Sequence, residues 1–140
     1  GTLGHMNTMT ASWGGAGILW GRPVAWCVIR PGRYTVQFME QGSTFTLSFF
    51  EERYRGALNL CGTQSGRDMD KVAATGLTPV QAENGGVYFA QARLVLVCNK
   101  IYYQDLDPQH FLDPTIERNY PIKDYHRMYM GEIVQCLSKG

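Results

Sequence analysis

The 140-residue sequence predicts one mainly β domain, a largely antiparallel barrel with a few short helices. Three observations predict this class. Strand-like patterns occur in about six places, the helical patterns are fewer and short, and the strands do not alternate regularly with long helices as they would in a doubly wound sheet. Sixteen glycines and six prolines separate these elements. Residues 1–140 are expected to form a single domain, because one domain usually has about 100–150 residues.

The first strand is expected at residues 7–13, where hydroxyl side chains alternate with apolar ones. The glycine-rich run at residues 14–17 should form the tight turn after it. Residues 23–30 are apolar on both faces, as in a strand that is covered on both sides. The remaining strands are expected at residues 44–50, 92–103 and 127–137, with a short edge strand at 87–89.

Three short helices are expected, at residues 33–41, 52–61 and 68–75. Each pattern runs into a glycine, at Gly42, Gly62 and Gly76, which favours a left-handed cap. Residues 105–121 form a polar connection that is interrupted by prolines. This connection is longer than an ordinary loop, and loops of this kind are usually functional or flexible.

The charge balance argues against nucleic acid as a partner. Thirteen Lys and Arg face twelve Asp and Glu, whereas nucleic-acid binding depends on neutralising many phosphates. No apolar run approaches the roughly 20 residues that cross a bilayer, and residues 1–6 lack the features of a signal peptide. The four cysteines form no C-x-x-C pair and are expected to be free thiols. These features predict a cytoplasmic protein without membrane or nucleic-acid partners.

A cationic turn at residues 30–35 is the first candidate site. The planar fork of arginine matches phosphate oxygens, and N–H groups at a helix start point toward an anion. No acidic residue precedes Glu40, so no nearby carboxylate neutralises Arg22, Arg30 or Arg33. The turn therefore predicts a phosphate site, and the alternative is a solvated basic turn.

A phosphate grip alone would hold a ligand weakly, so an apolar body must be bound as well. Met9, Trp13, Trp26 and Tyr34 are available to line a slot for it. These residue types point to a phosphorylated aromatic cofactor. Residues 65–71, a second loop that runs into a helix start, are a further candidate segment.

The sequence resembles the flavin reductase-like family of FMN-binding split barrels, particularly its flavoredoxin-type branch. The resemblance runs over nearly the whole chain and rests on six words in order: NTMTASW (7–13), RPGRYT (30–35), LSFF (47–50), SGRDMDK (65–71), DLDP (105–108) and YHRMYMGEI (125–133). It implies a split barrel that dimerises, with FMN in a groove near the subunit interface. It also implies an oxidoreductase that takes a hydride from NADH or NADPH and passes electrons to an acceptor.

The resemblance also implies roles for particular residues. Lys71 is the preferred cation near the electron-rich edge of the flavin, with the helix start near Asp68 as the alternative. His110, in the long loop, is a candidate for reaching the flavin. No side chain is assigned as acid, base or nucleophile, because the flavin performs the chemistry. The remaining implied cofactor-binding residues are Asn7, Thr10, Ser12 and Trp13 around the isoalloxazine and ribityl groups, Arg30, Arg33, Tyr34 and Thr35 at the phosphate, and Ser65, Gly66 and Arg67 closing the site.

One feature departs from the similar proteins, which generally have another strand before the NTMTASW-type segment. Only residues 1–6 precede that segment here. We therefore expect either a shortened N-terminus or an exposed sheet edge that a second copy covers.

Other interpretations of the same residues stay open. Ser12, Asp124 and His126 suggest a hydrolytic triad, although no G-x-S-x-G turn is present. His126 is also, by the resemblance, a candidate contact of the nicotinamide donor. Two further classes of function compete with the enzyme: an FMN-binding electron carrier that only a protein partner reduces, and a split barrel that binds haem or a pyridoxal-type ligand. A metal site at Asp107, His110 and Asp113 and a phosphate loop at residues 14–17 are weaker alternatives.

Overall fold

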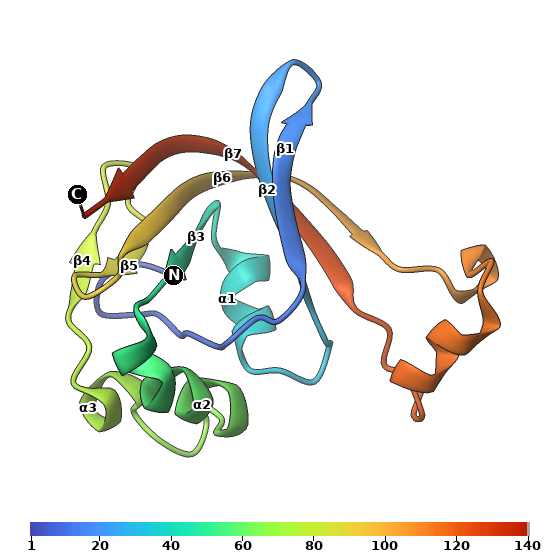
Figure 1. The fold of residues 1–140 in the computed structure, drawn as a ribbon, viewed down its shortest axis with the longest axis horizontal. Coiled ribbons are helices and arrows are strands. Elements are labelled where there is room, and N and C mark those ends of the chain that lie inside the picture. Colours follow the sequence, from blue (N-terminus) through green and yellow to red (C-terminus); the bar gives the residue numbers. More distant parts are fainter. Residues whose placement is uncertain (140) are drawn as a thin grey trace.

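The computed structural model describes residues 1–139. Its main feature is a curved antiparallel sheet with the strand order β1-β2-β7-β6-β3. A separate antiparallel pair, β4 and β5, lies beside β3. Figure 1 shows the sheet arching over helix α1. The predicted fold class, mainly antiparallel β with short helices, is confirmed. The strands are β1 (Gly14–Leu19), β2 (Arg22–Ile29), β3 (Thr44–Phe49), β4 (Pro79–Gln81), β5 (Val87–Phe89), β6 (Leu94–Asp105) and β7 (Arg127–Ser138).

The core lies between this sheet and α1 (Thr35–Gln41). Tyr129 and Cys98 are almost completely buried there. The pairing of β6 with β7 shifts register twice, which bends the two long strands around the helix. A glycine is required at Gly131, because a Cβ there would lie 2.6 Å from the Cβ of Cys98 and 2.8 Å from the ring of Phe45.

The helices confirm some of the expected boundaries and correct others. Helix α3 (Lys71–Thr75) ends at Gly76 with φ +71°, the predicted left-handed cap, but it begins at Lys71 rather than Asp68. The left-handed caps predicted at Gly42 and Gly62 are wrong. Gly42 is extended and leads directly toward β3, while α2 (Arg55–Thr63), after the short η1 (Glu52–Tyr54), continues through Gly62, which packs against Thr10.

The predicted positions of the first strand and of the turn after it are wrong. Residues 7–13 belong to no strand, and the expected turn at 14–17 is part of strand β1 instead. The alternating pattern was present, but a strand also needs a partner, and β2 pairs with residues 14–19. The turn lies at Trp20 and Gly21, with φ values of 55° and 68°. The short strand β4 was not predicted.

The long connection from β6 to β7 projects from the body of the molecule, as Figure 1 shows in orange. We call residues 106–126 the arm. It holds two 3-10 helices, η2 (Pro108–His110) and η3 (Pro114–Asn119), each with an aspartate cap, from Asp107 and Asp113 respectively. None of the helices in residues 1–139 is long and apolar enough to span a membrane.

Candidate functional site

Most of the predicted site residues line two neighbouring hollows. The arginine hollow, about 200 Å³, is lined by residues 9–13, Val28, Arg30, Arg33 and His126. The loop hollow, about 600 Å³, is lined by residues 4–8 and 66–72 together with Tyr34, Phe38 and Pro79. Of the predicted residues, Thr10, Ser12, Trp13, Arg30 and Arg33 lie at the first, and Asn7, Tyr34, Gly66, Arg67 and Lys71 lie at the second.

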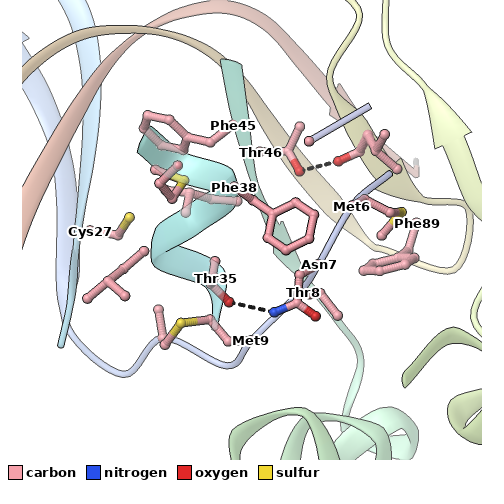
Figure 2. Close-up of a pocket in the computed structure, with 16 residues that line it drawn as sticks. Met6, Asn7, Thr8, Met9, Cys27, Thr35, Phe38, Phe45, Thr46 and Phe89 are labelled. Atoms are coloured by element: carbon pink, nitrogen blue, oxygen red, sulfur yellow. Dashed lines mark hydrogen bonds between the residues drawn. The ribbon is translucent and has the colours of Figure 1, made fainter. Parts of the chain in front are cut away.

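A third, smaller cavity of about 100 Å³ lies in the apolar interior beside α1 (Figure 2). At its edge the amide of Asn7 donates to the hydroxyl of Thr35 at 2.9 Å. Thr35 is buried and uses its hydroxyl in this contact. The hydroxyl fixes Asn7 between the cavity and the loop hollow, and Thr35 lines neither of the two larger hollows, so its role at a phosphate stays a prediction.

Residues 6–13 form an extended segment whose backbone is almost unused within the fold. Among residues 1–139, none of its N–H groups donates to another backbone group. Only one of its carbonyls, that of Thr8, accepts a hydrogen bond, from Lys71 at 2.7 Å. The hydroxyl of Thr10 fixes the segment to the carbonyl of Leu58 at 2.5 Å. Backbone groups of residues 9–13 are therefore available to a ligand in the arginine hollow.

The two arginines of the turn have different surroundings. Arg30 forms an ion pair with Asp124 at 3.0 Å and donates to the carbonyl of Asn119 at 2.9 Å. No carboxylate close in the sequence neutralises Arg30, as expected, but the fold brings Asp124 to it from 94 positions away. Arg22 likewise lies 3.9 Å from Glu132. Within the described residues 1–139, Arg33 has no carboxylate partner and only a 3.5 Å contact to the carbonyl of Cys61.

Lys71 is buried, with 5% of its surface exposed. Its ammonium donates to the carbonyls of Thr8 at 2.7 Å and Cys61 at 3.0 Å. Burial lowers the pKa of Lys71, and nearby Arg33 lowers it further, against an opposing effect of Cys61. Cys61 lies in the last turn of α2, where carbonyls lack helical partners and cations are favoured. The Cys61 carbonyl therefore accepts from Lys71 of the loop hollow and from Arg33 of the arginine hollow. No sequence pattern indicated this role.

The loop of residues 65–67 packs closely on the first segment and on Tyr34. A Cβ at Gly66 would lie 2.2 Å from the amide oxygen of Asn7 and 2.9 Å from the ring of Tyr34. The guanidinium of Arg67 lies 5.0 Å from the centre of the Tyr34 ring. The hydroxyl of Ser65 accepts from the backbone of Arg67, so Ser65 shapes the loop and lines neither hollow.

The two histidines of interest lie in very different places. His110 is exposed on the arm, 3.9 Å from Asp107, and lines neither hollow. The structure does not bring His110 to either hollow within one chain, and its contact with the flavin stays a prediction. His126 is 7% exposed and lines the arginine hollow, where its ring centre lies 5.1 Å from that of Trp13.

His126 does not form the hydrolytic triad that the sequence suggested. Its Nδ1 lies 2.7 Å from the hydroxyl of Tyr120, while Asp124 pairs with Arg30. Burial and Arg30 lower the pKa of His126, against an opposing effect of Asp124. In the described part of the chain no three His, Cys, Asp or Glu residues converge as metal ligands, so Asp107, His110 and Asp113 are not brought together.

The comparison with protein families decides what kind of domain carries these hollows. The family model of the flavin reductase like domain matches residues 2–139. The chain belongs to the flavin reductase-like family. The six words between residues 7 and 133 predicted this family, and that prediction is confirmed.

Solved structures agree on the fold. The FMN-binding protein of Thermus thermophilus, solved with p-hydroxybenzaldehyde, superposes with a TM-score of 0.75 at 19% identity, covering 95% of this chain and 64% of that one. The flavoredoxin of Desulfovibrio vulgaris gives 0.73 at 22% identity, with 95% and 62% covered. The flavoredoxin of Methanosarcina acetivorans gives 0.73 at 18%, with 95% and 61% covered. The chain thus spans less than two thirds of each of these proteins. No protein of curated function matches it.

In this flavin reductase-like domain, three of the six words line the two hollows and a fourth contributes His126, whereas residues 47–50 and 105–108 line neither. Residues 7–13 and 30–35 line both hollows, and residues 66–71 line the loop hollow. The site residues remain predictions, and His126, expected from the sequence as a contact of the nicotinamide donor, lines the arginine hollow.

Proposed function

We propose that this domain binds FMN and acts as an oxidoreductase of the flavin reductase or flavoredoxin type. In this proposal it takes a hydride from NADH or NADPH and passes electrons to an acceptor. The observation that carries the proposal is that residues 9–13, whose backbone groups are unused among residues 1–139, line the same hollow as Arg33, which has no carboxylate partner in that range. The family match supports a flavin-related oxidoreductase in general.

The residues present fit FMN. The polar edge of a flavin ring carries both hydrogen-bond donors and acceptors, and the free N–H and C=O groups of residues 9–13 complement both kinds. Arg33 is the candidate for the phosphate, because its guanidinium has no carboxylate partner within residues 1–139. Arg30 is less suitable, since Asp124 and Asn119 already occupy it.

The size of the hollows fits a ligand that extends through both. The arginine hollow, at about 200 Å³, is smaller than the usual small-molecule site, about 300–1,000 Å³, whereas the loop hollow of about 600 Å³ lies in that range. Charged hydrogen bonds contribute about 1.5–3 kcal/mol each, and micromolar binding requires about 8 kcal/mol. Met9 and Trp13 therefore need to contribute apolar contact in addition to the arginine.

When bound, the flavin supplies hydride and electron transfer. The chain's own residues bind and tune it. The buried ammonium of Lys71 favours negative charge nearby, because little water screens it. Trp13 is 48% exposed at the mouth of the arginine hollow, which leaves room for a second molecule to approach. No side chain is assigned as an acid, base or nucleophile.

A second copy of the chain completes the proposal. The arm carries Leu112 and Ile122, which are 97% and 79% exposed in one chain. Strand β1 has a free edge and no buried residue. Exposed apolar side chains and open sheet edges are usually covered in solution. We expect a homodimer in which the arm contributes to the interface, and the four free cysteines suit a reducing compartment such as the cytoplasm.

The test is to mix the purified chain with FMN and follow visible absorbance without oxygen. Uptake of FMN, and bleaching of the bound flavin by NADH or NADPH, are the expected results. A chain that takes up no FMN contradicts the proposal. If dithionite bleaches the bound flavin but neither nicotinamide does, the chain is an electron carrier and the hydride step is refuted.

A further inference from the structure

A tyrosine and a histidine form a buried pair at the wall of the arginine hollow. His126 precedes β7 and lies against Trp13. The hydroxyl of Tyr120, from the arm, lies 2.7 Å from its Nδ1. Both side chains are more than nine-tenths buried. Nothing in the proposed binding of FMN uses Tyr120, yet it is the residue that sets how the histidine faces the hollow.

The hydrogen bond determines which nitrogen of His126 carries the proton. Among residues 1–139, Nδ1 of His126 is the one side-chain hydrogen-bond partner of the Tyr120 hydroxyl. A buried hydroxyl proton needs an acceptor, and Nδ1 is the acceptor at hand. A neutral imidazole that accepts at Nδ1 carries its hydrogen at Nε2. The ring can therefore donate from Nε2.

Burial and the positive charge of Arg30 favour the neutral form of the His126 ring. The guanidinium of Arg30 lies 5.0 Å from the centre of the Tyr120 ring, and Arg33 lines the same hollow. Asp124 is the nearest carboxylate, but it is paired with Arg30. Burial and Arg30 lower the pKa of His126 below its ordinary 6.5, so Asp124 does not hold a second proton on the ring at pH 7.

We propose that Tyr120 is a positioning residue that holds His126 as the neutral Nε2–H tautomer, from which it donates to an oxygen of the molecule that meets the flavin in the arginine hollow. The second half of this inference rests on the proposed function; the first half does not. The oxygen belongs to an uncharged or anionic group, since the hollow also holds Arg30 and Arg33.

The tautomer is tested on the full chain alone, by ¹⁵N NMR of its three histidines at neutral pH. His126 is expected to show a protonated Nε2 and an unprotonated Nδ1. Tyr120→Phe keeps the ring beside Arg30 but removes the hydroxyl, and the tautomer preference should disappear. Tyr125→Phe is the matched control, because it removes a hydroxyl bonded to Glu117 in the same aromatic cluster. A protonated Nδ1 in the unmodified chain, or an unchanged tautomer in Tyr120→Phe, overturns the inference.

The donating role is tested by the anaerobic rate of flavin reduction. Tyr120→Phe is expected to slow it about tenfold, the scale of one lost hydrogen bond, while Tyr125→Phe leaves it unchanged. In a His126→Gln background, whose amide donates without a tautomer, Tyr120→Phe should cause no further loss. Equal losses in both backgrounds would mean that Tyr120 acts only through packing and would refute the donating role. A chain that binds no FMN fails the proposed function, whereas the NMR result still decides the tautomer.

Discussion

Arg30 and Arg33 lie three positions apart on one turn, yet the fold gives them different tasks. Arg30 connects β2 to the arm through Asp124 and the carbonyl of Asn119. Arg33 keeps a single long contact to the carbonyl of Cys61. An arginine without a strong partner is free to bind an anion, whereas a paired one must first break its own contacts. The binding role therefore belongs to Arg33.

Arg33→Ala is expected to weaken FMN binding at least about tenfold, because a charged hydrogen bond contributes about 1.5–3 kcal/mol. Riboflavin, which lacks the phosphate, should lose much less. Fluorescence titration of both ligands measures the difference. Arg53→Ala is the control, since Arg53 is an exposed residue that pairs with Glu51. Equal losses for FMN and riboflavin would exclude Arg33 as the phosphate ligand, and Arg67 in the loop hollow would be the next arginine to replace.

The sequence predicted which residues gather at the hollows, but not which of them lack an ion-pair or hydrogen-bond partner within the fold. The words around 7–13, 30–35 and 65–71 are local, so their residues could be named in advance. The partner of Arg30 is 94 positions away, and the carbonyl that holds Lys71 belongs to another helix. Such contacts depend on tertiary packing, which no local pattern encodes.

The β1–β2 hairpin shows why a strand pattern alone misplaced an element. Residues 7–13 alternate as a strand does, but the register that pairs Gly14 with Cys27 and Leu19 with Arg22 begins after them. The turn needs positive φ at both central positions, and Trp20 and Gly21 supply them. The glycine-rich residues 14–17 suggested a turn, but the pairing of β1 with β2 places the turn at Trp20 and Gly21.

Gly21→Ala is expected to lower the free energy of unfolding by about 1 kcal/mol, because an L residue is disfavoured at φ 68°. Gly17→Ala is the matched control in the same hairpin. A Cβ meets no atom within 4 Å at either position, and only Gly21 has a positive φ. Urea denaturation of both variants measures the effect. Equal stability of the two variants would show that backbone conformation at this turn contributes nothing measurable.

Helix α1 is joined to the sheet through Glu40. The buried hydroxyl of Tyr129 donates to its carboxylate at 2.5 Å, and Arg127, which also pairs with Asp105, donates to it at 2.7 Å. These hydrogen bonds lower the pKa of Glu40 below its ordinary 4.5. Because the folded pKa is depressed, the stabilisation is fully present above pH 4.5 and is lost as the pH falls through the lower folded value.

Tyr129→Phe is expected to cost about 1 kcal/mol near pH 7, at the low end for a charged acceptor because water reaches Glu40. The difference from the unmodified chain should shrink below pH 4.5. Urea denaturation between pH 3 and pH 7 measures both effects. A difference that is independent of pH would mean that the hydroxyl contributes through packing and not through the carboxylate.

The arm projects from the body of the molecule and gives a single chain an open shape. It leaves the body between β6 and β7 (Figure 1), and its contacts with the body include the ion pair of Asp124 with Arg30 and the ring contact of His126 with Trp13. The exposed Leu112 and Ile122 have no role inside one chain. The fold class was predictable from the spacing of strands and glycines. The direction in which residues 106–126 project was not, because three prolines and two aspartate caps define local turns only.

Light scattering is expected to give about twice the 15.8 kDa mass of one chain. Replacing both Leu112 and Ile122 by Asp should reduce this to the mass of one chain, because charges at a covered apolar contact are unfavourable. Circular dichroism of the variant checks that the sheet is intact. A monomer before any replacement would contradict the homodimer, and a dimer after both replacements would place the interface elsewhere.

Because the backbone N–H groups of residues 9–13 donate no hydrogen bond within the fold, their hydrogen exchange should report whether the site is occupied. Amide protons without an internal hydrogen bond exchange rapidly with deuterium from the buffer, and their exchange slows when a ligand accepts a hydrogen bond from them. Mass spectrometry should therefore find rapid deuterium exchange at residues 9–13 without flavin and slower exchange after FMN is added. Strands β6 and β7 should stay protected in both conditions. The bound molecule would then act as the strand's missing neighbour.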